Sequence, residues 1–119
     1  MTITFRPQDL DSAQMEESLL APPSASPLSG DIVTRSQIFF RNDDGLLSGT
    51  WESEVGTARW EFVDRGEIIH VLSGRMIATV DDGEPVEITA GTTAYFPLGW
   101  RGTWDVQERL RKVFVVYPR

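Results

Sequence analysis

Turn sequences recur at short intervals along the chain from about residue 36 onward. They are rich in Gly, Pro, Asn and Asp, residues that favour tight turns, and they lie at 42–45, 64–66, 73–74, 81–83, 90–91 and 97–99. Most are about 8 to 12 residues apart, which is typical of short antiparallel strands. The segments between them favour strands, at 38–41, 49–53, 58–63, 67–72, 75–80, 85–89, 93–96, 101–106 and 111–117. This spacing predicts an all-β sandwich or barrel.

Alternation along residues 67–72 indicates which side chains share a face. Successive side chains of a strand point to opposite sides, so Glu67, Ile69 and Val71 share one face and Ile68, His70 and Leu72 share the other. Both faces are largely apolar, which is expected where one side meets a core and the other a packed surface. A closed sheet would use one of these faces to line its interior.

The first 35 residues lack the regular spacing of turn signals seen in the rest of the chain. Residues 8–20 carry a weak helical pattern, and Asp11 and Gln14 are spaced as a capping pair. The proline-rich stretch 22–27 then breaks any helix. We therefore predict an N-terminal arm over 1–35 with one or two helical turns, and a barrel over 36–119. The arm either packs on the barrel or a second subunit, or forms a partly mobile terminus.

Composition narrows the possible partners. The 119 residues fit one domain, and a net charge of -7 without a Lys/Arg cluster argues against nucleic acid. The absence of cysteine excludes disulfides, thiolate metal sites and cysteine nucleophiles. The start of the chain lacks the pattern of a signal peptide, and no apolar stretch is long enough to span a bilayer. We expect a soluble, cytoplasmic protein with no membrane partner.

Two motifs resemble those of the cupins. The run 67–75 followed by Asp82-Gly83 resembles the first cupin motif, and Ala90-Gly91 with 97–99 resembles the second. Segments 49–53, 96–104 and 111–114 resemble more narrowly a cupin subfamily of unknown function, DUF861. That subfamily is similar to the cupin domain of ureidoglycine aminohydrolase and to the ethanolamine-utilisation cupin. The resemblance implies an RmlC-like jelly roll, a double-stranded β-helix barrel with a ligand cavity, commonly as a homodimer.

The resemblance also shows where metal ligands would be expected. Metal-binding cupins typically present two histidines and a glutamate from the first motif and one histidine from the second. Aligned on Glu67, the first two histidine positions fall within 60–63 and the last falls on Gly102, whereas His70 is the only histidine of the chain. We therefore expect no metal or other cofactor; Mn, Fe, Ni or Zn would be the metals to test. We interpret His70 as a packed, hydrogen-bonded structural residue.

Glu67 and Lys112 are the candidates for ligand contact or catalysis. The resemblance places both in the cavity, where a carboxylate and an ammonium could hold a small carboxylate or amine metabolite. They could also form an internal ion pair that only neutralises itself. Trp60, Phe62 and Trp104 fall at former metal-side positions, where their rings would either line the pocket or fill the core.

Three functions are compatible with these residues. The first is small-molecule binding without the usual metal, through Trp60, Phe62, Glu67, Trp104 and Lys112. The second is an enzyme of nitrogen or amine metabolism resembling ureidoglycine aminohydrolase, with Glu67 as acid/base and Lys112 as anchor. The third is a structural or partner-binding dimer with a filled barrel. Fold alone does not decide among them.

Overall fold

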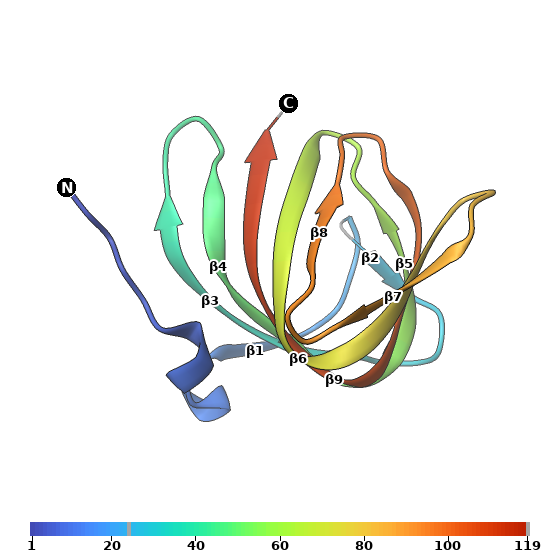
Figure 1. Cartoon of the computed structure of the whole chain (residues 1–119), viewed down its shortest axis with the longest axis horizontal. Helices are drawn as coiled ribbons and strands as arrows, with labels where there is room; N and C mark the ends of the chain where they lie inside the picture. The colour runs from blue at the N-terminus through green and yellow to red at the C-terminus, as the bar shows by residue number, and fades with distance from the viewer. Residues whose placement is uncertain (24, 119) are drawn as a thin grey trace.

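The computed structural model of the chain describes residues 1–23 and 25–118. It confirms the all-β prediction, and Figure 1 shows its strands curling into a half-barrel. The strands of the described residues are β1 (Glu16–Leu19), β2 (Ala25–Pro27), β3 (Val33–Arg41), β4 (Leu47–Ser53), β5 (Gly56–Glu61), β6 (Arg65–Val80), β7 (Pro85–Thr89), β8 (Thr93–Phe96) and β9 (Arg101–Pro118). No helix of the described residues is long and apolar enough to cross a membrane.

Two long, bent strands join the layers of the barrel. The first part of β6 pairs with β8 and with the last part of β9, and the second part of β6 pairs with β7 and with the first part of β9. β4 and β3 extend one layer beyond β9, and β5 extends the other. Segments predicted as separate strands at 67–72 and 75–80 are therefore one strand, β6, and those at 101–106 and 111–117 are one strand, β9.

A bulge lets β6 bend from one layer to the other. Its register against β9 shifts repeatedly between Val71 and Met76, and Gly74 lies within this irregular stretch at a φ of 92°. A side chain at Gly74 would collide with the carbonyl oxygen of Arg109 on β9. The predicted turn at 73–74 is thus a kink within a strand, which only glycine accommodates here.

The interior is filled at one end by aromatic rings. Alternation along β6 is as predicted, because Glu67, Ile69 and Val71 are buried whereas Ile68 and His70 are exposed. Trp60 and Trp104 stack with ring centroids 4.1 Å apart, and Phe62, Phe96 and Trp100 pack around them. This cluster ties β5, β8 and β9 together and fixes the positions of the side chains beside it.

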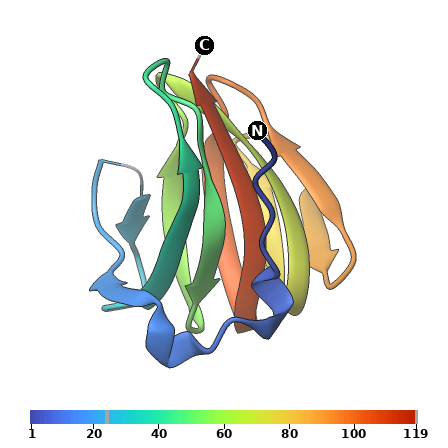
Figure 2. The ribbon, with the colours of Figure 1, turned by 90° about the vertical axis from the view of Figure 1, so that its left-hand side faces the viewer.

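The N-terminal arm packs on the outside of the barrel, as Figure 2 shows. Two short 3₁₀ turns, Pro7–Asp9 and Ser12–Gln14, account for the predicted helical turns, and Asp11 and Gln14 form the predicted capping box. The Arg111 guanidinium donates to the carbonyl oxygens of Pro7 and Leu10 and pairs with the buried Glu52. The arm is therefore held to β4 and β9 by charged hydrogen bonds.

Residues beyond the 3₁₀ turns join the sheet. β1 pairs with β3, and β2 pairs with β5 at the opposite edge of the sheet. The weak helical pattern of residues 8–20 gives helical turns only as far as Gln14, and β1 begins at Glu16. The predicted boundary between arm and barrel falls inside β3, which begins at Val33.

Candidate functional site

A buried ion pair connects β6 and β9. Inward alternation along β9 places Lys112 between Leu110 and Phe114, and the neighbouring strand β6 carries Glu67 on the same inner face. The Lys112 ammonium donates to Glu67 Oε2 at 2.5 Å. Lys112 is 2% exposed and Glu67 is 4% exposed, so water contributes little to their solvation. Each charge therefore depends on the other and on the groups around it.

Aromatic rings surround the Lys112 ammonium. Its Nζ lies 4.4 Å from the ring centre of Trp104, 4.5 Å from that of Trp51 and 5.6 Å from that of Trp60. These faces attract a cation and offset part of the cost of burying it. Burial nevertheless lowers the pKa of Lys112 from its usual 10.5, and the Glu67 carboxylate only partly opposes that shift.

A cavity of about 290 Å³ opens beside the ion pair. Its charged lining residues are Arg65, Glu67 and Lys112. Three hydroxyl-bearing residues from β1 and β3 also line it, Ser18, Thr34 and Ser36. The rest of the wall is apolar and consists of Leu19, Leu20, Ala21, Ile38, Leu47, Trp51, Trp60, Phe114 and Val116. Residues 18–21 thus bring the N-terminal segment into the cavity wall.

The predicted site residues divide into two groups. Trp60, Glu67 and Lys112 line the cavity. Phe62 and Trp104 are not among its lining residues and lie almost fully buried in the aromatic cluster. Whether any of the five contacts a ligand stays a prediction.

Sequence reasoning missed several parts of this site. Trp51 pairs directly with Lys112 across β4 and β9, and its position within the 49–53 motif could have identified it. Lys112 is also the only lysine of the chain, beside ten arginines, a signal visible in the sequence. Residues 18–21 gave no such signal. The sequence of β1 does not alternate between polar and apolar residues, and all four of its residues are exposed.

The donors in this cavity do not fit the metal site of a typical cupin. Glu67 faces inward, but its carboxylate is bonded to the Lys112 ammonium. Trp60 and Phe62 fill inward positions on and after β5, and Gly102 offers no side-chain donor. Among residues 1–23 and 25–118, no group of three His, Cys, Asp or Glu side chains could hold a metal ion.

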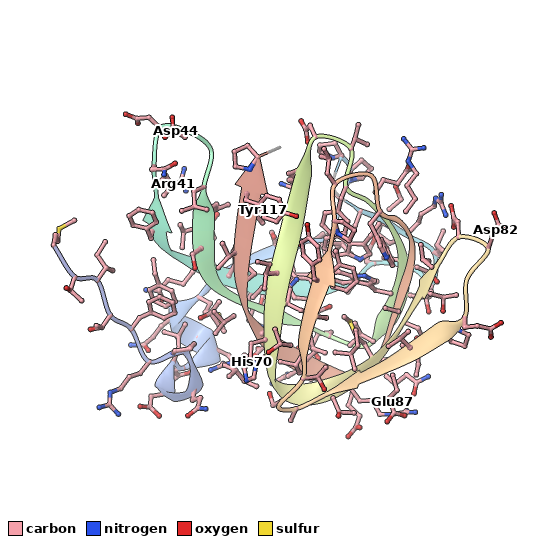
Figure 3. All side chains as sticks on the ribbon, turned by 45° about the horizontal axis from the view of Figure 1, so that its top comes forward. Arg41, Asp44, His70, Asp82, Glu87 and Tyr117 are labelled. Carbon is pink, nitrogen blue, oxygen red and sulfur yellow. The ribbon has the colours of Figure 1, made fainter. Side chains whose placement is uncertain are left out.

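His70 lies on the other face of β6, where it is labelled in Figure 3. Its Nδ1 is 2.8 Å from the hydroxyl of Thr93 on β8, so the predicted hydrogen bond exists. The side chain is exposed and not packed in the core, so that part of the prediction is wrong. Its orientation follows from the three-residue spacing to Glu67.

Comparison with known proteins supports the fold and identifies the family. The EutQ-like cupin domain family matches residues 41–114, more than half of the chain. The EutQ protein of Clostridium difficile is 25% identical with a TM-score of 0.63, over 73% of this chain and 64% of that one. A DUF861 protein of Thermotoga maritima is 35% identical with a TM-score of 0.52, over 55% of this chain and 73% of that one.

One similar structure belongs to a protein that is considerably longer than this chain. A Pseudomonas syringae protein of unknown function from the DUF861 family is 21% identical with a TM-score of 0.72, over 90% of this chain but 46% of that one. The chain thus spans less than two thirds of the Clostridium and Pseudomonas proteins. A search of the curated proteins found no match. The family match and these structural similarities agree with the jelly-roll arrangement, and the chain belongs to the EutQ-like cupin family.

Proposed function

We propose that the chain binds a small carboxylate metabolite in the cavity, with the Lys112 ammonium as the charged contact. The observation that carries this proposal is the number of hydrogen-bond partners of Lys112. An ammonium has three N–H donors, and among residues 1–23 and 25–118 Glu67 is the acceptor bonded to Nζ. A ligand carboxylate would accept from the remaining donors inside a largely apolar site.

Charge favours a carboxylate over an amine. Lys112, Glu67 and Arg65 are the charged residues among those that line the cavity. Arg65 also acts on Lys112, since its charge helps to lower the pKa of that ammonium. A ligand anion would offset this repulsion, whereas a protonated amine would add to it.

Size and polarity limit the rest of the ligand. A volume of about 290 Å³ lies at the small end of ligand pockets, which are typically about 300 to 1,000 Å³. Leu20, Ile38 and Phe114 offer apolar surface, and Ser36 offers a hydroxyl. These features suit a short carboxylate with an apolar chain or a single further polar group.

Isothermal titration calorimetry tests this proposal with acetate, propionate and butyrate against propylamine and butylamine. We expect the carboxylates to bind and the amines not to bind. Lys112→Met should weaken carboxylate binding roughly tenfold or more, because it removes a charged hydrogen bond. The control Arg59→Gln breaks the Arg59–Asp81 ion pair, which lies apart from the cavity-lining residues, and should leave affinity unchanged.

Glu67→Gln provides a second variant that keeps the Lys112 side chain. It removes the carboxylate that competes for the Lys112 donors, and a bound carboxylate replaces Glu67 as the counter-charge, so carboxylate affinity should stay equal or rise. Preference for amines, or unchanged carboxylate affinity in folded Lys112→Met, would contradict the proposal. Loss of carboxylate binding in folded Glu67→Gln would contradict it as well.

A further inference from the structure

Lys112 differs from every other basic residue of the chain in its chemical type. Apart from His70, the other ten basic residues are all arginine. Even the second strongly buried carboxylate, Glu52, is paired with arginines, Arg35 and Arg111. An arginine stays charged at any working pH, whereas a buried lysine can give up its proton and become a nucleophile. The one lysine thus stands at the cavity wall, where a neutral amine could act on a ligand.

The geometry points to imine formation between Lys112 and a small aldehyde or ketone in the cavity, with Glu67 as the proton carrier. Three observations support this step. Lys112 Nζ contacts Glu67 Oε2 at 2.5 Å, close enough for direct proton transfer. The surrounding rings of Trp51 and Trp104 provide a poorly solvated environment. Burial also favours the neutral amine, since it lowers the pKa of Lys112.

The step balances with water as its other product. Glu67 first accepts a proton from the Lys112 ammonium, and the neutral amine then forms a bond to the carbonyl carbon. A proton then moves from the nitrogen to the oxygen of this adduct, directly or through Glu67. The result is a neutral carbinolamine beside a protonated Glu67. Glu67 then donates its proton to the hydroxyl, the C–O bond breaks, and water leaves. The products are a protonated imine on Lys112, an ionised Glu67 and water, with no oxidant or reductant required.

Imine formation uses the same cavity as the proposed function, but it does not depend on carboxylate affinity. The test therefore uses a neutral probe, propanal, with cyanoborohydride to reduce any imine to a stable propyl amine. The chain has two kinds of amine to modify, the Lys112 side chain and the α-amino group of Met1. Peptide mapping by mass spectrometry gives the rate at each, and Met1 serves as the internal reference.

In the unfolded chain Lys112 should react more slowly than Met1 at neutral pH, because a free lysine is the more basic amine. We expect folding to raise the ratio of Lys112 to Met1 modification. Glu67→Gln should lower the rate at Lys112 roughly tenfold or more without changing that at Met1, because proton transfer by a positioned carboxyl is lost. The control Glu87→Gln, which removes an exposed partner of Arg75, should change neither rate.

Modification of Met1 alone in the folded chain would overturn the inference, as would an equal rate at Lys112 in folded Glu67→Gln. If Glu67→Gln does not fold, the comparison of native and urea-unfolded wild-type protein decides by itself. A Lys112 adduct without carboxylate binding in calorimetry would refute the proposed function alone. Carboxylate binding without a Lys112 adduct would refute imine formation alone.

Discussion

Burial and ion pairing change the pKa of Lys112 in opposite directions. Lost hydration favours the neutral amine, whereas Glu67 and the ring faces favour the ammonium, and burial dominates. Glu67 and Lys112 were identified from the resemblance to a cupin subfamily. Their contact was not predictable from either residue alone, because it depends on the register of β6 against β9, which local sequence does not determine.

The lowered pKa of Lys112 predicts a rise in stability at alkaline pH. Between the folded pKa and the usual 10.5, the unfolded chain binds more protons at this site than the folded chain does. The contribution of Lys112 to stability is therefore fully present above 10.5 and is lost as the pH falls through the folded pKa. The free energy of unfolding in urea, measured across the alkaline range, should show this rise.

The matched control is the double variant Glu67→Gln with Lys112→Met, which carries neither charge. The wild-type chain should gain stability relative to this variant as the pH rises. Titration of other groups occurs in both proteins and cancels in the difference. Parallel curves for the two proteins would show that burial does not lower the pKa of Lys112.

Among the elements, β6 depends most on one backbone position. Gly74 has a φ of 92° where β6 changes layer, and any side chain there would meet the Arg109 carbonyl. Gly74→Ala should therefore destabilise the fold by about 3 kcal/mol or more, from backbone strain together with the displaced β9. Gly91→Ala is the matched control, since Gly91 has a φ of 88° but open space around it. It should cost about 1 kcal/mol, and equal losses in urea unfolding would contradict this explanation.

The N-terminal arm depends on Arg111, which joins it to Glu52 on β4. Arg111→Gln leaves a buried carboxylate with fewer partners and should cost about 3 kcal/mol of folding free energy. Arg101→Gln removes an exposed ion pair with Glu61 and should cost less than about 1 kcal/mol. Limited proteolysis should also cut the arm faster in Arg111→Gln. Similar stability and cutting rates in the two variants would contradict this role of Arg111.

The turn signals predicted the positions of several strands well. They failed at the bend within β6 and at the edge strand β1. Predicted strands at 85–89 and 93–96 coincide with β7 and β8, because Gly-containing turns bound both. The continuity of β6 across residues 73–74 was not predicted, because a glycine in the sequence can indicate either a β-bulge or a tight turn. β1 was missed because its four residues are all exposed and form a strand only by pairing with β3.

At the scale of the whole molecule, the barrel is filled at one end and hollow beside the ion pair. The aromatic cluster around Trp104 fills one part, and the cavity beside Lys112 occupies another. The fold class was predictable because turn spacing and alternation are properties of the sequence. The cavity was not, because its wall combines β1, β3, β4, β5, β6 and β9, which come from distant parts of the chain. The homodimer expected from the cupin resemblance stays a prediction.

The most direct test of carboxylate binding at Lys112 observes its side-chain nitrogen. Because the chain has one lysine, protein labelled with nitrogen-15 at lysine Nζ gives a single side-chain amine signal in NMR. Titration with butyrate should shift that signal in a saturable manner, whereas butylamine should leave it unchanged. An Nζ signal that does not move at saturating butyrate, in folded protein, would contradict the proposed binding of a carboxylate by Lys112.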